Sequence, residues 1–416
     1  MLGANGLKES LRDGMFGLRL SVFFIAIFFI VGCYMPFLPV WLKSRELTDA
    51  QISLIYAVPV IVRALFTPAM TFAADRSGRP VALLKWLAWG GLITVAMLPF
   101  TGGFPSIFTI ILIFTLFWMS VIPVTDSLAL TGARAGKADY GRMRLWGSFS
   151  YIAMTSAGGV AVDFWGPQAA LWLFIGAAGC VVFASYWLPP DRPDGAIAQS
   201  AQMPPAAPKL RLADMLQLIR LPDLWLFFAA AGAIQSAHAL YYIFGTLHWT
   251  SAGISPTVIG SLWGIGVIAE IALFAYGRQV SHWFGPAQLL VLAAMAAVIR
   301  WTITAYDPPL AVLFAVQTLH GLTFGAAHLG AMQFIDRAIP DRMASSAQGL
   351  YASVTVGFIM GIVSLAAGPL YRSFGGEAYL AMAFVSVLGL LLSLALMRRW
   401  TGGPILTPTA REAAAE

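Results

Sequence analysis

Long apolar runs, each ended by a short polar segment, recur along the whole chain. A run of about 20 apolar residues is long enough for an α-helix to cross the hydrocarbon core of a bilayer. The pattern therefore predicts an all-α membrane protein with twelve transmembrane helices. They are expected near 17–42, 51–74, 80–100, 105–133, 141–162, 167–188, 222–249, 256–277, 286–305, 308–337, 344–373 and 378–397.

A polar stretch between the sixth and seventh predicted helices divides them into two sets of six. Residues 189–221 are rich in Pro, Ala and Gln and include Lys209, Arg211 and Arg220, which is typical of a cytoplasmic linker. The expected organisation is an N-terminal six-helix bundle (1–188), the linker (189–221), a C-terminal six-helix bundle (222–400) and a cytoplasmic tail (401–416).

A weak internal repeat supports the two halves. Leu47–Ser53 resembles Ile254–Gly260, and each segment opens a predicted helix just after an aromatic-rich stretch. The same offset places Arg63 opposite Glu270, so each half carries one charged residue at an equivalent place in an apolar span. Parallel repeats of six helices, with a site between them near mid-membrane, are how one large class of transporters is built.

Composition agrees with a membrane protein, since 59% of the residues are hydrophobic and 11% are charged. The net charge of +6 does not point to nucleic acid, because the basic residues form short clusters in loops. One set of loops carries Arg76, Arg79, Arg134, Lys137, Arg337, Arg398 and Arg399, and the opposite set carries little beyond Lys43, Arg45 and Arg372. By the positive-inside rule both termini are expected in the cytoplasm, with the chain in a bacterial-type inner membrane.

The cysteines and the N-terminus add little to this interpretation. Cys33 and Cys180 both lie in apolar spans, so we expect no disulfide, no metal site and no cofactor. Met1–Leu18 is polar and mixed, and it predicts no cleavable signal peptide.

Polar side chains inside the predicted spans are the candidates for function. Glu270 lies in the middle of the apolar run Gly260–Gly277. A carboxylate there costs roughly 2.5–3.5 kcal/mol unless partners or water surround it. The other polar groups of this kind are Arg63, Asp126, Arg144, Gln235, His238, Arg300, Gln317, His320 and His328.

Their depths follow from the rise of a helix, about 1.5 Å per residue. His238, Arg300 and His320 each come out roughly 20–25 Å from the cytoplasmic ends of their helices. Glu270 and His328 come out at roughly 10–14 Å, and Asp126 and Arg144 at roughly 7–11 Å. Groups at matched depth can pair if their helices are neighbours.

A structural role competes with function for each of these residues, because a single Arg can join two helices and a single His can be a satisfied core residue. Burying Arg63, Asp126, Glu270 and Arg300 together would cost on the order of 10–14 kcal/mol, comparable to the stability of a whole domain. Neutral side chains would join helices at lower cost, so the set favours function. Among the aromatic residues inside spans, those best placed to flank a flat ligand are Trp146, Tyr241, Tyr242 and Trp263.

Several segments together resemble the major facilitator superfamily, in particular its phenylpropionate permease branch and, more distantly, the lactose permease. They are Asp139–Ser148 (DYGRMRLWGS), Gln235–Tyr242 (QSAHALYY), Leu262–Trp263 with Ala269–Glu270, Ile299–Trp301, Gln317–His320 and Ala327–Leu329. The superfamily loop signature G-x-x-x-D-R-x-G-R is matched by Asp75, Arg76, Gly78 and Arg79, with Thr71 in place of the first glycine. This loop is expected to gate the transporter.

The resemblance implies proton-coupled uptake by alternating access. Asp126 and Arg144 match the residues that hold substrate in the lactose permease, and Glu270, Arg300 and His320 match residues that handle substrate and proton. Thr323 stands where that family has a proton-carrying carboxylate, so the carrier stays open among Glu270, His328 and Asp126. The expected substrate-binding set is Asp126, Arg144, Trp146, Gln235, His238, Tyr241, Tyr242, Arg300, Gln317 and His320.

The hypothesis is therefore import of a small organic solute with a proton, an aromatic carboxylate such as a phenylpropionate being the first candidate. The expected partners are this solute, protons and the lipid bilayer, with a monomeric chain and no nucleic acid. A sugar or nucleoside proton symporter and a proton-coupled exporter of drugs or metabolites stay open as alternatives. An enzyme is disfavoured, because neither H-E-x-x-H nor G-x-S-x-G occurs in the chain.

Overall fold

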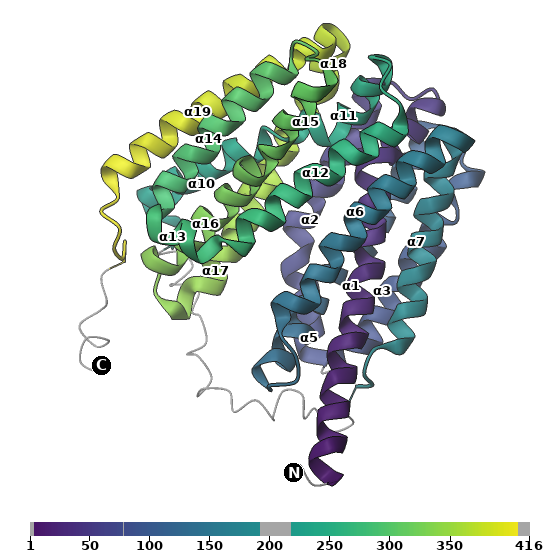
Figure 1. Ribbon diagram of the computed structural model, residues 1–416, viewed down its shortest axis with the longest axis vertical. Coiled ribbons are helices and arrows are strands. Elements are labelled where there is room, and N and C mark those ends of the chain that lie inside the picture. Colours follow the sequence, from purple (N-terminus) through teal and green to yellow (C-terminus); the bar gives the residue numbers. More distant parts are fainter. Residues whose placement is uncertain (1–3, 78, 192–217, 407–416) are drawn as a thin grey trace. The chain divides into compact units, whose positions relative to one another are not determined.

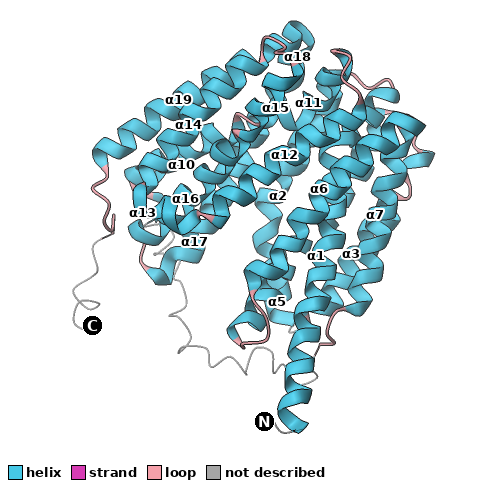
Figure 2. Cartoon of the chain, in the orientation of Figure 1, coloured by secondary structure: helices cyan, strands magenta, loops and turns pink. Residues whose placement is uncertain are grey.

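The computed structural model describes residues 4–77, 79–191 and 218–406, and within them every regular element is helical (Figure 2). Gly78, most of the expected linker (192–217) and the end of the tail (407–416) lie outside the described residues, as do the side chains of Asp75 and Arg76 in the expected gating loop. The helices of the first part are α1 (Ala4–Ser44), α2 (Asp49–Ser77), α3 (Pro80–Val95), η1 (Leu98–Phe100), α4 (Phe104–Trp118), α5 (Val121–Arg134), α6 (Tyr140–Trp165) and α7 (Gln168–Trp187).

The second part of the chain is equally helical. Its elements are α10 (Pro222–Ser236), α11 (Ala239–Ser251), α12 (Pro256–Ala275), α13 (Gly277–Trp283), α14 (Pro286–Thr304), α15 (Leu310–Thr318), η2 (Gly321–Ala326), α16 (Ala327–Ala338), α17 (Asp341–Tyr351), η3 (Ala352–Ile359), α18 (Met360–Phe374), η4 (Gly375–Ala378) and α19 (Tyr379–Arg399). Of these, η2 and η3 are π-helical, so their turns are wider than those of an α-helix.

The predicted number of spans is confirmed. Nine stretches of the described residues are long and apolar enough to cross a membrane, and one of them, Ser346–Arg399, has 54 residues and contains two spans. The more polar helices α2 and α6, with 29 and 26 residues, are also long enough to span. Nine stretches, one of them double, and these two helices make twelve.

Several of the predicted spanning helices are not regular α-helices over their whole length. The expected helix 105–133 ends at Trp118 and restarts at Val121, because the ring of Pro123 is incompatible with the carbonyl four residues earlier in a helix. The expected helix 222–249 breaks at Ala237–His238, and 308–337 and 344–373 each contain a π-helical segment. Each of these stretches is still long and apolar enough to cross a membrane, as predicted.

By their internal contacts, the residues form two compact units. The first unit comprises 1–204 with 241–265, and the second comprises 205–240 with 266–416. In the first, α1 packs along α6 and α7 (Figure 1), and α3 packs along α4 and α7. In the second, α19 packs along α10 and α14, and α14 also packs against α16 (Figure 1). The bundle limits at 188 and 222 stay a prediction.

Two glycines let α6 and the first half of α12 cross closely within the first unit. A methyl group on Gly159 would collide with the carbonyl of Pro256, and one on Gly260 would collide with the carbonyl of Thr155. These obstacles are backbone atoms, which cannot rotate away. Small residues at such crossings are typical of membrane helices, because they allow close van der Waals contact.

We expect Gly260→Ala to destabilise the protein by about 1–3 kcal/mol, because the added methyl group meets fixed backbone. Thermal unfolding in detergent measures the effect. Gly176→Ala on α7 is the matched control, because nothing lies within 4 Å of its added methyl group. Equal melting temperatures for the two variants would contradict this account of the crossing.

Candidate functional site

A helix break places His238 in the interior of the second unit. The helix α10 ends at Ser236, and the backbone N–H of His238 bonds the carbonyl of Gln235 at 3.2 Å. The ring Nδ1 of His238 lies 3.1 Å from the same carbonyl oxygen. The ring is therefore folded back on the end of its own helix, where it is fully buried.

Arg300, on α14, is the most buried charged group of the site, with 0% of its surface exposed. Its Nη1 donates to Nδ1 of His320 and to Oγ1 of Thr323, each at 3.0 Å. Its Nη2 donates to Oε1 of Gln317 at 2.5 Å. The guanidinium carbon also lies 4.5 Å from the ring centre of Trp301. Three neutral acceptors and an aromatic face therefore lie against this cation.

The helix around His320 is shaped to bring these acceptors together. α15 ends at Thr318, and the π-helical η2 begins at Gly321, directly after His320. A methyl group on Gly321 would overlap the carbonyl of Ala269, so this glycine permits α12 to approach closely. As a result Oε2 of Glu270 lies 3.9 Å from Nε2 of His320.

The hydrogen bonds determine where His320 carries its proton. A guanidinium can only donate, so Nδ1 of His320 must accept from Arg300. The neutral ring then holds its hydrogen on Nε2, the nitrogen that faces Glu270. His320 therefore connects the cation and the carboxylate, with one ring nitrogen toward each.

Glu270 lies deeper than its position in the sequence suggested. The depth estimate put it roughly 10 Å closer to the cytoplasm than His320, and this was wrong, because the two side chains lie 3.9 Å apart. The eighth span was expected to end at residue 277, but α13 continues the helical path to Trp283. Thirteen residues from Glu270 to Trp283 correspond to roughly 20 Å, which matches the depth of His320.

His328 lies on the same face as His320 but is separated from it by a ring. Phe324 stacks on His320 at 5.4 Å and on His328 at 6.2 Å, with the planes nearly parallel in both pairs. Phe274 meets His328 edge-on at 6.2 Å. An aromatic ring cannot pass a proton, so His328 is joined to the site by packing.

A second polar group lies in the first unit. The hydroxyl of Tyr140 donates to Oδ1 of Asp126 at 3.1 Å. Arg144 lies one turn farther along α6, its guanidinium carbon 4.1 Å from the ring centre of Phe28. A methyl group on Gly147 would overlap that ring, so the glycine makes room for Phe28. The predicted pair Asp126 and Arg144 thus lies in one cluster.

Arg63, the counterpart of Glu270 in the internal repeat, is half-buried on α2. Two turns before it on the same face, Tyr56 donates to the backbone carbonyl of Tyr34 at 3.1 Å, and the two rings lie 5.3 Å apart. These tyrosines form an aromatic surface on the side of α2 that carries Arg63.

The remaining predicted residues are spread more widely. Tyr241 stacks on Trp263 at 4.3 Å and Tyr242 lies 6.4 Å from the same ring, all in the first unit. These tyrosines were expected on one helical face with Gln235 and His238, and the break at Ala237–His238 interrupts the helix that would carry that face. Trp146 is 52% exposed.

Sequence reasoning did not give Thr323, Trp301 and Tyr140 a role in the site. Thr323 was noted as the residue that replaces a carboxylate, and it accepts a hydrogen bond from Arg300. Its spacing of three residues from His320 was the available signal, because such residues share a helical face. Tyr140 lies beside Asp126 only through the fold, and no sequence spacing would have paired them.

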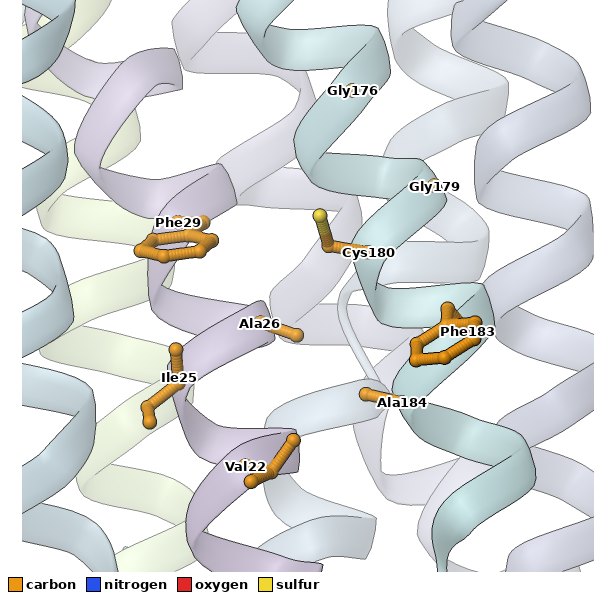
Figure 3. Close-up of a pocket in the computed structure, with 9 residues that line it drawn as sticks. All are labelled: Val22, Ile25, Ala26, Phe29, Gly176, Gly179, Cys180, Phe183 and Ala184. Atoms are coloured by element: carbon orange, nitrogen blue, oxygen red, sulfur yellow. The ribbon is translucent and has the colours of Figure 1, made fainter.

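An apolar groove lies between α1 and α7 of the first unit (Figure 3). Its volume is about 350 Å³, and its nine lining residues include Phe29, Gly176, Cys180 and Phe183 but no charged side chain (Figure 3). It faces outward, since Phe183 is 81% exposed. A groove of this composition offers a polar solute nothing to bind.

A family model and curated relatives match most of the chain, and a solved structure shares its fold. The model of the MFS_1 like family matches residues 17–381. A probable 3-phenylpropionic acid transporter of Escherichia coli (strain K12) is 30% identical over 90% of this chain and 96% of its own. The maltose permease of Geobacillus stearothermophilus is 27% identical over 91% of this chain and 94% of its own. The solved nucleoside transporter NupG is 18% identical, covers 93% of this chain and 99% of its own, and has a TM-score of 0.78.

Arg300→Lys is expected to destabilise the protein by about 1–3 kcal/mol, because a single ammonium cannot reach acceptors on both sides and leaves one buried group unpaired. The measurement is the thermal unfolding midpoint in detergent. Arg278→Lys serves as the control, since that arginine is exposed. An Arg300→Lys protein as stable as the control would show that the fork of hydrogen bonds is dispensable.

Proposed function

The chain belongs to the MFS_1 like family of transporters, and from this membership we propose that it takes up a small organic solute together with a proton by alternating access. The observation that carries the proposal is the series of side-chain contacts from Arg300 through His320 to Glu270 inside an apolar unit. It contains one fixed positive charge, one carboxylate that can take a proton, and a ring that contacts both.

Charge neutrality supplies the coupling. With Glu270 ionised and both histidines neutral, the charges of Arg300 and Glu270 cancel. A proton on Glu270 leaves the group with a net positive charge, and an anionic substrate restores neutrality. Two unit charges roughly 4 Å apart attract by about 4 kcal/mol at an effective dielectric constant of about 20, so proton and anion each favour the binding of the other.

An aromatic carboxylate is the first substrate candidate. A carboxylate binds a guanidinium more strongly than neutral acceptors do, and it can use two nitrogens at once. It would replace the neutral partners that hold Arg300 in this structure. The similarity to a probable 3-phenylpropionic acid transporter supports the same class. Asp126 and Arg144, in the first unit, stay predicted substrate-binding residues.

A neutral, hydroxyl-rich solute is the second candidate. Asp126 and Tyr140 offer a carboxylate and a hydroxyl, which suit the hydroxyl groups of sugars and nucleosides. The similarity to a maltose permease supports this alternative. Such a solute would couple to the proton through hydrogen bonds and would not need the charge of Arg300.

We place the protein in a bacterial-type inner membrane as a monomer with both termini in the cytoplasm. The support for this orientation is the distribution of Lys and Arg among the loops. The loop with Asp75, Arg76, Gly78 and Arg79 is proposed to gate the transporter.

Uptake into proteoliposomes tests the function. Labelled 3-phenylpropionate, maltose and uridine are offered with and without an imposed gradient, acidic outside. We expect the acid to accumulate above its external concentration only with the gradient. Accumulation of the sugar or the nucleoside in its place would select the second candidate, and gradient-driven extrusion would favour an exporter.

Glu270→Gln tests the proton carrier. The amide cannot take up a proton, so gradient-driven accumulation should fall to the level of equilibration while exchange of internal for external substrate continues. Glu377→Gln is the control, because Glu377 is exposed. If Glu270→Gln accumulates substrate like the wild type, the carrier lies elsewhere, with Asp126 and His328 next to be tested.

A further inference from the structure

Two series of polar contacts, called arms below, start from one nitrogen of Arg300, Nη1. Nη1 donates to His320, which leads to Glu270, and the same nitrogen donates to Thr323. The second arm continues, because Oγ1 of Thr323 lies 2.9 Å from Nε2 of His238. Both ends of this second arm are fully buried.

The direction of the second arm follows from the donors and acceptors. Nδ1 of His238 faces the carbonyl of Gln235, which can only accept, so Nδ1 carries a hydrogen. A second cation next to Arg300 would be repelled, so the ring is neutral and its Nε2 is an acceptor. The hydroxyl of Thr323 therefore donates to His238, and its oxygen accepts from Arg300.

The hydroxyl of Thr323 accepts well from a cation only when another acceptor binds the hydroxyl's own hydrogen. It rotates about its C–O bond, so its hydrogen can point toward a neighbouring donor or away from it. The alternative acceptor for the hydrogen of Thr323 is the carbonyl of His320, at the limiting distance of 3.5 Å. His238, at 2.9 Å, is much better placed to hold the hydrogen away from Arg300.

The His238 ring is itself fixed by packing. It meets the edge of Trp301 at 5.2 Å, and Trp301 stacks on Tyr379 at 5.8 Å. With Nδ1 on a carbonyl and Nε2 on a hydroxyl, both ring nitrogens are engaged inside the protein. The sequence-based expectation that His238 contacts substrate stays a prediction, and this arrangement favours a different role for the ring.

We propose that His238 is a positioning residue: its neutral ring accepts the Thr323 hydroxyl and thereby fixes the acceptor that holds the guanidinium of Arg300. The inference rests on the proposed function and assigns a role within it. When the arm through His320 loosens as proton and substrate bind, the arm through Thr323 and His238 keeps Arg300 in place to receive the carboxylate.

Four variants separate this role from others. His238→Gln keeps an acceptor near the place of Nε2, whereas His238→Leu keeps bulk and removes the acceptor. Thr323→Ser keeps the hydroxyl, and Thr323→Val removes it at nearly constant shape. Thr94→Val is the control, because that buried hydroxyl bonds the carbonyl of Gly90 on its own helix, α3, in the first unit.

The transport measurement uses labelled 3-phenylpropionate in proteoliposomes. We expect His238→Leu and Thr323→Val each to raise the half-saturation concentration roughly tenfold, the scale of one lost buried hydrogen bond, with a smaller change in maximal rate. His238→Gln and Thr323→Ser should stay near the wild type. The double variant His238→Leu with Thr323→Val should be no worse than Thr323→Val alone.

Each departure from this pattern overturns the inference. If His238→Leu has the half-saturation concentration of the wild type, the ring only fills space. A His238→Gln as impaired as His238→Leu would mean that the imidazole itself contacts substrate or carries the proton. Additive losses in the double variant would mean that His238 and Thr323 act independently.

A measurement without substrate keeps this test separate from that of the proposed function. Thermal unfolding of the same variants in detergent should show the same non-additivity, with Thr323→Val lowering the midpoint and His238→Leu adding little to it. This pattern would stand even if the wild type did not take up 3-phenylpropionate. Additive shifts would overturn the positioning role even if proton-coupled uptake were established.

Discussion

The constraint on which the second unit depends is a positive charge that is fully buried in an apolar helical bundle. Arg300 cannot lose its proton in a protein, so its charge must be stabilised where it stands. Hydrogen bonds to His320, Thr323 and Gln317, together with the face of Trp301, contribute to this stabilisation. A guanidinium binds a carboxylate more strongly than it binds any of these neutral acceptors.

The irregular parts of the helices serve this constraint. The break after Ser236 frees the carbonyl of Gln235 to accept from the His238 ring, and the π-helical turn after His320 lets both His320 and Thr323 reach Arg300. Gly321 allows α12 close enough for Glu270 to face His320. Regular helices would have satisfied their own backbone more completely, but they would have presented these side chains in other directions.

Much of this arrangement could be predicted from the sequence. Where the prediction failed, the structure shows the reason. Long apolar runs predicted the twelve spans. The estimated depths of His238, Arg300 and His320 were equal, and the three residues lie in one hydrogen-bond network. The depth of Glu270 was wrong because α13 continues the helix beyond the expected end. The break at Ala237–His238 has no proline or glycine to mark it, so nothing in the local sequence separated Tyr241 from His238.

The order of acceptors around Arg300 gives each neighbour a different part in coupling. His320 lies between Arg300 and Glu270, so any change of charge on Glu270 acts on the ring that holds the guanidinium. A second proton on His320 would bind Nδ1 and turn this nitrogen into a donor. The hydrogen bond from Arg300 would then be lost, because Nδ1 could no longer accept it. Thr323 and His238 carry no such conflict, because the hydroxyl can accept from one side while it donates to the other. The arm through His320 and Glu270 therefore responds to protons, and the arm through Thr323 and His238 holds the guanidinium in position. Arg300 needs both arms if it is to exchange a neutral acceptor for a substrate carboxylate without moving away.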